Sequence, residues 1–140
     1  MKLVRIAREE WDVLAVLDSR EKCQVLDFLE DLNGPESAAA QNMMSLLLEK
    51  VPSLGPPRRE PACKSLGEGV YEFRRQQKGK KLRVLWFYGG AAVIVCTAAF
   101  KKAERTPRVP LDQARFLCKQ YWVARSRGEL EILEKKEGEP

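Results

Sequence analysis

Three consecutive runs decide the fold: Gly69-Val-Tyr-Glu-Phe-Arg74, Lys81-Leu-Arg-Val-Leu-Trp-Phe-Tyr88 and Ala91-Ala-Val-Ile-Val-Cys-Thr-Ala-Ala99. The first run alternates its side chains as a β-strand does, and the third is apolar along its length, which fits a strand covered on both faces. A Gln-Lys-Gly turn follows the first run, and the Gly89-Gly90 pair is a hairpin signal after the second. Because both connections are short, the three runs predict an antiparallel meander.

Further elements flank this meander. Residues 11–17 are rich in β-branched and aromatic side chains and predict a strand, with a helix beginning at Arg8 as the alternative, and residues 3–6 could form another short strand. Residues 23–32 and 35–51 have apolar side chains at helical spacing, and Pro52 is expected to end the second of these helices. The short loop between the two predicts an αα-hairpin.

The proposed elements predict an α+β fold. We expect a small antiparallel sheet with an N-terminal helical hairpin and a C-terminal helix, which begins at Pro110, gathered on one face. The Pro-rich residues 53–62 are expected to be a connector. One domain should span residues 1–125, and residues 126–140, which are charged and poor in large apolar side chains, predict a flexible tail.

Composition excludes several classes of site. The 140 residues include no histidine, and the four cysteines, at positions 23, 63, 96 and 118, form no CxxC pair. We therefore expect buried, reduced thiols and neither a metal nor a cofactor. No GxSxG, Walker or dinucleotide-binding motif is present. No apolar run approaches the ~20 residues of a membrane span, and no signal-peptide pattern is seen, so a cytoplasmic location is expected.

Positive charge is concentrated in the middle of the chain. The whole sequence has a net charge of +5 and a pI near 9.1. Residues 71–108 contain ten basic residues against Glu72 and Glu104, a net charge of +8. Such a segment indicates a polyanionic partner, although solvated strand faces and salt bridges would also explain it.

The meander should bring some of these cations together. Arg74 and Arg83 fall on neighbouring strands, and the Lys101-Lys102 pair follows the third strand. In an antiparallel meander the end of the third strand lies beside the start of the second and near the end of the first, so these side chains can converge at one edge. Convergent cations on rigid strands suit the binding of a phosphodiester and of its transition state.

The sequence resembles a known family at four places. These are Val25-Leu-Asp-Phe-Leu29, Lys64-Ser-Leu-Gly-Glu-Gly-Val-Tyr-Glu-Phe-Arg74, Arg83-Val-Leu-Trp-Phe-Tyr88 and Ala99-Phe-Lys-Lys-Ala-Glu-Arg-Thr-Pro107. Together they resemble the phage-derived Gp49-like (HigB) branch of the RelE/ParE toxin superfamily, which belongs to type II toxin–antitoxin systems. The resemblance covers about residues 11–124.

The resemblance implies a toxin that cleaves mRNA, often on the ribosome, without a metal, and that a helix-turn-helix antitoxin neutralises. The 2′-OH of RNA attacks the adjacent phosphate and leaves a 2′,3′-cyclic phosphate. Arg83 would then contact the scissile phosphate, Lys102 would assist the transition state or the leaving group, and Arg74 would be a third catalytic candidate that positions the RNA backbone. The remaining RNA-binding candidates are Arg75, Lys78, Lys80, Lys81, Lys101 and Arg105.

The sequence also departs from the family pattern. Many relatives carry a histidine where this chain has Cys96-Thr-Ala-Ala-Phe100, and some use a tyrosine where it has Arg108. Tyr121 is expected in the helix core, and Tyr88 is a candidate with an equally plausible packing role. The general base stays open, and a lysine whose pKa neighbouring cations lower could serve. Two alternatives remain: a non-catalytic gyrase inhibitor of the ParE type, and an inactive module that binds RNA or an antitoxin.

Overall fold

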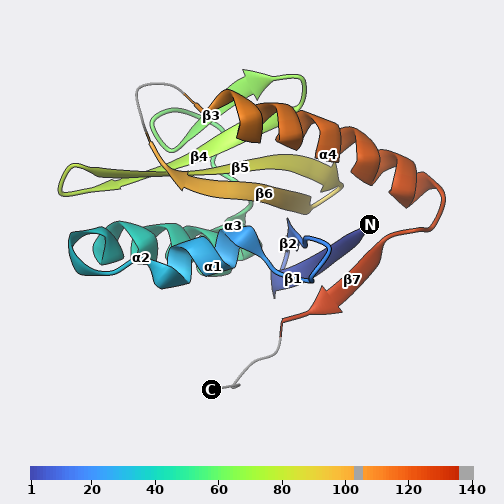
Figure 1. Cartoon of the computed structure of the whole chain (residues 1–140), viewed down its shortest axis with the longest axis horizontal. Helices are drawn as coiled ribbons and strands as arrows, with labels where there is room; N and C mark the ends of the chain where they lie inside the picture. The colour runs from blue at the N-terminus through green and yellow to red at the C-terminus, as the bar shows by residue number, and fades with distance from the viewer. Residues whose placement is uncertain (103–105, 136–140) are drawn as a thin grey trace.

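A mixed sheet forms the centre of the protein in this computed structural model, which describes residues 1–102 and 106–135. Its strand order is β3-β4-β5-β6-β2-β1-β7 (Figure 1). The predicted meander is confirmed as β4, β5 and β6, which pair antiparallel. The sheet as a whole is not antiparallel, however, because β2 pairs parallel with β6 and β1 pairs parallel with β7. The strands are β1 (Lys2–Arg8), β2 (Asp12–Val16), β3 (Cys63–Gly67), β4 (Val70–Gln77), β5 (Lys80–Gly90), β6 (Val93–Lys101) and β7 (Glu131–Glu134).

The first two strands form an antiparallel hairpin, which confirms the strands expected near the N-terminus. Arg8 is the last residue of β1, so the alternative of a helix beginning there is wrong. Across the hairpin, Arg5 donates from Nε to Asp12 Oδ1 at 2.8 Å. β2 then joins the meander through its parallel pairing with β6, which places the hairpin at the edge of the three predicted strands.

The segment between β2 and β3 is largely helical and covers one face of the sheet (Figure 1). Met43 and Leu47 from this layer share a buried core with Val84 and Trp86 of β5. These β5 residues alternate with Leu85 and Phe87, which face the other way, as the period of a strand requires. The elements of this layer are α1 (Gln24–Asp31), η1 (Gly34–Glu36), α2 (Ser37–Ser45), η2 (Leu46–Lys50) and α3 (Val51–Leu54).

Pro52 does not end this helical segment, contrary to expectation. The preceding turn, η2, is π-helical, and the Val51 N–H donates to Leu46 O. Pro52 then falls in the first turn of α3, where its missing N–H leaves no helical hydrogen bond unmade. The wider turn therefore lets the chain continue as a helix to Leu54.

The C-terminal helix α4 (Arg108–Ser126) lies on the opposite face of the sheet from α1 and α2 (Figure 1). The expectation that all helices gather on one face is therefore wrong. Ala114 of α4 packs with Val70 and Leu85, and Tyr121 packs with Phe87. A strand that is buried on both faces, such as β6, needs helices on both sides of the sheet. The apolar sequence of β6 already indicated this arrangement.

Two strands were not predicted. β3 pairs antiparallel with β4 at the sheet edge, immediately after the Pro-rich connector. β7 lies within the segment that we expected to be a flexible tail, and it pairs parallel with β1. Ile132 of β7 packs into the same core cluster as Leu3. The apolar pair Ile132-Leu133 within a charged segment is therefore enough to form this edge strand. Residues 136–140 of the predicted tail lie outside the described part of the chain.

The turn between β5 and β6 lies at Ala91-Ala92 rather than at Gly89-Gly90. Gly89 remains in β5, and Tyr121 packs so closely against it that a Cβ at this position would lie 2.9 Å from Tyr121 Oη. The Tyr121 hydroxyl donates to Gly89 O at 2.8 Å. None of the described helices is long and apolar enough to cross a membrane.

Candidate functional site

A buried carboxylate organises the cationic residues of the meander. Alternate residues of β4 face the side of the sheet on which α4 packs, namely Val70, Glu72 and Arg74. Glu72 is 0% exposed. Its Oε1 accepts from Arg74 Nε at 3.1 Å, and its Oε2 accepts from Thr106 Oγ1 at 2.7 Å. Buried charges need such partners, so Glu72 and the cations beside it must be considered together.

Arg83 is the second cation on this carboxylate. It lies directly opposite Arg74 in the β4–β5 register, and its Nε is 3.4 Å from Glu72 Oε1. Its Nη1 donates to Leu82 O at 2.8 Å. Burial lowers the pKa of the Arg83 guanidinium. The negative charge of Glu72 raises this pKa, and the positive charge of Arg74 lowers it further. Two like charges opposite each other on a sheet repel, and the carboxylate between them offsets that repulsion.

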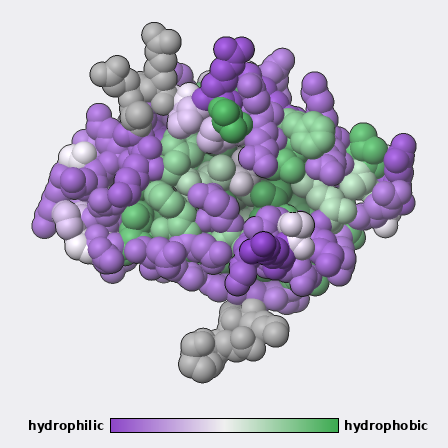
Figure 2. Space-filling view, in the orientation of Figure 1, coloured by the Kyte–Doolittle hydropathy of each residue, from purple (hydrophilic) through white to green (hydrophobic). Residues whose placement is uncertain are grey.

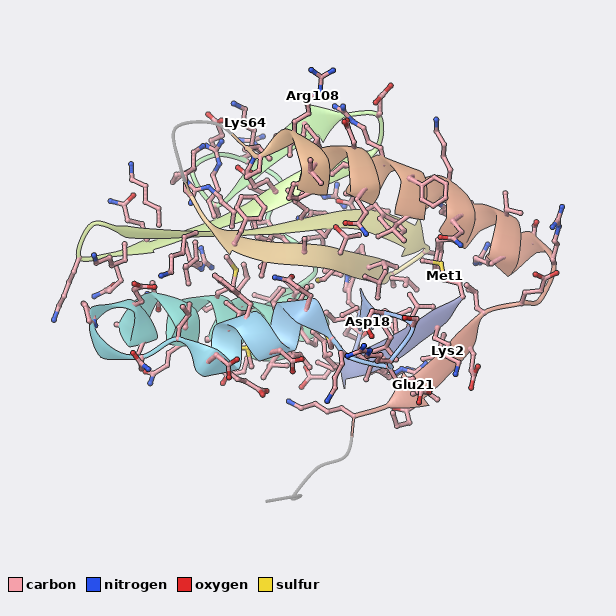
Figure 3. The ribbon with its side chains drawn as sticks, in the orientation of Figure 1. Met1, Lys2, Asp18, Glu21, Lys64 and Arg108 are labelled. Carbon is pink, nitrogen blue, oxygen red and sulfur yellow. The ribbon has the colours of Figure 1, made fainter. Side chains whose placement is uncertain are left out.

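Lys102 completes the group. Its backbone N–H donates to Lys81 O at 2.9 Å, so the residue is held to the start of β5 immediately after β6 ends. Burial lowers the pKa of the Lys102 ammonium, the Glu72 charge opposes the shift, and the cations Arg83, Arg74 and Lys64 reinforce it. In the view of Figure 3, Lys64 and Arg108 project from the same side of the molecule. We call Glu72, Arg74, Arg83, Lys102 and Thr106 the cationic cluster.

An open pocket of about 450 Å³ adjoins the cationic cluster. Arg74 also reaches Glu60, with its Nη1 3.5 Å from Glu60 Oε1, so this residue spans from the buried carboxylate to the surface. The pocket gives an external ligand access to both arginines. It is lined by Pro61, Ala62, Arg74, Arg75, Gln76 and Arg83.

Lys101 does not join the cluster, which corrects the predicted convergence. Its register partner on β5 is Leu82, which faces the α1–α2 layer, and its Nζ lies 2.7 Å from Glu36 Oε2. Lys102 lies just past the end of β6, where it lines a pocket with Lys101 but has its ammonium under the influence of the charges of Glu72, Arg83 and Arg74. The structure therefore brings together Arg74, Arg83 and Lys102, and places Lys101 on the other face.

The remaining RNA-binding candidates lie along the β4–β5 hairpin. Lys78 is in its turn, and Lys80 and Lys81 begin β5 beside Lys101 and Lys102 around a pocket of about 190 Å³. In the view of Figure 1 this turn projects from the molecule, and Figure 2 shows mainly hydrophilic side chains at that end. The candidate Arg105 lies outside the described residues.

Arg75 faces the side opposite Arg74. It lines a pocket with Leu46 and Lys50 of η2, and its Nη1 donates to Arg74 O at 3.4 Å. Burial lowers the pKa of its guanidinium. Arg75 therefore contacts the η2 side of the sheet and also lines the pocket beside the cationic cluster with Arg74 and Arg83.

The two tyrosines considered from the sequence are both away from the cluster. Tyr121 is 2% exposed, which confirms it as a helix core residue. Tyr88 packs against Trp86 on the α1–α2 face, with ring centroids 4.9 Å apart. Glu72 and Thr106 were missed as site residues. A signal for Glu72 was available in Val70-Tyr-Glu-Phe-Arg74. Strand alternation places this charged residue on the same face as the apolar Val70, where a buried position is expected.

The cysteines behave as small apolar residues. Cys23, Cys63 and Cys96 are buried and Cys118 is half-buried, all as free thiols. Burial raises the pKa of the Cys96 thiol. Among the residues that the structure describes, no three histidine, cysteine, aspartate or glutamate side chains come together as metal ligands.

A protein-family model matches most of the site-bearing part of the chain. The family model for "Phage derived protein Gp49-like (DUF891)" matches residues 27–119. This range contains every residue of the cationic cluster and the whole β4–β5–β6 meander. No curated protein matches the chain.

Proposed function

The chain belongs to the phage-derived Gp49-like family of RelE/HigB-type toxins, and we propose that it is an endoribonuclease that cleaves mRNA without a metal ion. The family indicates a toxin of a toxin–antitoxin system with an antitoxin partner. The observation that supports cleavage is the grouping of Arg74, Arg83 and Lys102 around one buried carboxylate beside an open pocket.

In the proposed reaction, the 2′ oxygen of a ribose forms a bond to the adjacent phosphorus, and the bond from phosphorus to the 5′ oxygen breaks. The products are a 2′,3′-cyclic phosphate and a 5′-hydroxyl end. A base takes the proton of the 2′-OH, and water supplies a proton to the 5′ oxygen. RNA carries this internal nucleophile and DNA does not.

Arg83 is proposed to bind the scissile phosphate. Within the described residues, its side chain donates one hydrogen bond, to Leu82 O, so most of its five N–H donors remain for a ligand. The Glu72 carboxylate lies 3.4 Å from Arg83 Nε, and although it makes no hydrogen bond there, its charge favours a guanidinium held in this buried place. A guanidinium that is oriented in advance stabilises the charge that develops on the phosphate oxygens.

Lys102 is proposed to be the general base. A base must be neutral to accept a proton, and the lowered pKa of Lys102 increases its neutral fraction near pH 7. Arg74, which reaches from Glu72 toward Glu60, would hold an adjacent phosphate. The lysines of the β4–β5 turn would extend the path of the RNA backbone.

The proposed partners rest on the family match and on the resemblance described above. We propose that mRNA on the ribosome is the substrate, that the protein acts in the cytoplasm, and that a helix-turn-helix antitoxin neutralises it. The purified chain should cleave a reporter mRNA, with ribosomes supplied, and leave 2′,3′-cyclic phosphate ends. A 2′-deoxy substitution at the cleaved position should block cleavage there.

Arg83→Ala is the decisive variant, with Arg20→Ala as its matched control. Arg20 is exposed in the turn between Asp18 and Glu21, which Figure 3 shows far from Lys64 and Arg108. Arg83→Ala should lose cleavage and Arg20→Ala should keep it. Intact mRNA with the unsubstituted protein, with and without ribosomes, would overturn the proposal, and a DNA-damage response on expression would then favour gyrase inhibition.

A further inference from the structure

A second pocket lies on the face of the sheet opposite the cationic cluster. Its volume is about 500 Å³, and it opens where the segment after α3 passes β4 and β5. Trp86 and Tyr88 belong to the α1–α2 side of β5, whereas Arg83 belongs to the other side. The pocket is lined by Pro57, Arg58, Cys63, Tyr71, Trp86 and Tyr88.

Aromatic rings make up much of this lining. Tyr71 stacks on Trp86 with ring centroids 4.8 Å apart and an interplanar angle of 24°. Tyr88 stands nearly perpendicular to both, at 5.4 Å from Tyr71 and 4.9 Å from Trp86. Both tyrosines are only half-buried, so parts of their rings remain open to a planar ligand.

Trp86 also brings an unsatisfied hydrogen-bond donor. The residue is 1% exposed, and its Nε1 has no hydrogen-bond partner within the described residues. The Cys63 thiol beside it is a weak acceptor. Burial raises the pKa of this thiol to about 11 and the adjacent Trp86 N–H opposes the rise, but the contact does not have the geometry of a hydrogen bond. A buried N–H without a good acceptor is costly, so a ligand that offers an acceptor here would gain affinity.

Arg58 supplies positive charge at the mouth of the pocket. Its side chain is exposed and lies close to Tyr88, where burial raises the pKa of the phenol and the Arg58 charge opposes that rise. An exposed guanidinium beside aromatic rings suits an anionic group attached to a planar one.

We propose that this pocket binds a nucleobase, which stacks on the exposed tyrosine rings and accepts from Trp86 Nε1, with the nucleotide's phosphate against Arg58. A nucleotide joins the three required features in one molecule: a planar ring, a hydrogen-bond acceptor on that ring, and an anion. Base–aromatic stacking is a general mode of single-strand recognition. The inference goes beyond cleavage, because the pocket contains none of the cluster residues.

Calorimetric titration of the full chain with adenosine 5′-monophosphate tests the proposal, with ribose 5-phosphate as the ligand that lacks a base. The mononucleotide should bind at least about fivefold more tightly, since stacking on aromatic side chains contributes about 1 kcal/mol or more per base. Equal affinity for the two ligands would show that only the phosphate is bound, and would overturn the proposal.

Two neighbouring arginines provide a matched pair. Arg58→Ala should weaken binding of the mononucleotide several-fold, whereas Arg59→Ala, which removes the same charge at an exposed residue that does not line the pocket, should not. Trp86→Phe replaces the indole by a smaller aromatic ring and removes the N–H, and should also weaken binding. Equal effects of the two arginine substitutions would contradict the proposal.

The source of the base and the link to cleavage can be separated. A short RNA that displaces the mononucleotide would identify the pocket as part of the RNA path, and failure to displace it would identify a free nucleotide as the ligand. Lys119→Ala, which removes an exposed cation of α4 on the other face of the sheet, should leave mononucleotide binding unchanged. Loss of binding in that variant would show that removal of any positive charge is enough, and would overturn the inference.

Discussion

Arg74 and Arg83 lie directly opposite each other on β4 and β5, and their Nε atoms stand 3.1 Å and 3.4 Å from the same oxygen of Glu72. Two guanidinium groups in this register would repel each other without a carboxylate between them. Glu72 is 0% exposed and Arg83 7%, so solvent screens neither charge effectively. The pair of arginines and the carboxylate therefore form one unit, and a change in one member affects the others.

Substitution of the central carboxylate should be costly. Glu72→Gln keeps the size of the side chain but leaves Arg83 buried without an opposite charge, so we expect a loss of about 3 kcal/mol in the free energy of unfolding. Urea denaturation measures it. Glu21→Gln is the control, because it breaks the exposed pair with Lys2 and should cost less than about 1 kcal/mol. Similar losses in the two variants would show that Glu72 carries no special electrostatic role.

Adjacent lysines should differ in function. Lys102→Ala removes the proposed base and should lower the rate of mRNA cleavage by roughly 100-fold or more. Lys101→Ala breaks an ion pair with Glu36 on the other face, and should change the cleavage rate little while costing less than about 1 kcal/mol of stability. Single-turnover cleavage and thermal unfolding separate the two effects. A large loss of cleavage in Lys101→Ala would return that residue to the catalytic group.

The pH dependence of cleavage should follow Lys102. Its pKa is lowered in the folded protein, and the neutral form is the active one, so the cleavage rate should rise with pH and level off below the ordinary lysine value of 10.5. The Lys64 charge contributes to the lowering, so Lys64→Gln should move the profile slightly toward higher pH. Lys119→Gln on α4 is the control and should not move it. A profile that falls as pH rises would exclude Lys102 as the base.

Local sequence patterns predicted the part of the fold that depends on neighbouring residues. The meander, the two N-terminal strands and the facing of Arg74 and Arg83 all follow from alternation and short turns. The parallel pairings of β2 with β6 and β1 with β7 join segments far apart in the chain, and no turn residue signals them. The site was predicted only in part, because local patterns indicate where its arginines face but not which charges become buried. Glu72, the buried carboxylate of the site, was counted only as one charge of the basic segment.

The C-terminal strand should stabilise the domain. A chain that ends at Gly128 lacks β7, whereas one that ends at Lys135 retains it and is the matched reference. Without β7, β1 loses a paired neighbour and Leu3 loses its contact cluster with Ile132, so unfolding should become easier by about 2 kcal/mol. Chemical denaturation of the two truncated chains measures the difference. Equal stability would mean that β7 contributes no net free energy.

The contact between α4 and β5 can be tested by a double-mutant cycle. Tyr121→Phe removes the hydrogen bond to Gly89 O and leaves a buried carbonyl without that donor, which should cost about 1–2 kcal/mol. Gly89→Ala puts a Cβ 2.9 Å from Tyr121 Oη and 2.9 Å from Val95 Cγ2, and should cost about 1–3 kcal/mol through overpacking.

The two substitutions should not be additive. Loss of the Tyr121 hydroxyl removes one of the three close contacts that the new methyl group makes, so the double variant should be more stable than the sum of the single losses by about 0.5–1 kcal/mol. The contacts with Val95 Cγ2 and with the Cζ of residue 121 remain in the double variant, so the rescue should be incomplete. Urea denaturation of the four proteins gives the coupling free energy. Strict additivity would mean that β5 shifts away from α4 to admit the methyl group, and that Tyr121 does not fix the position of Gly89.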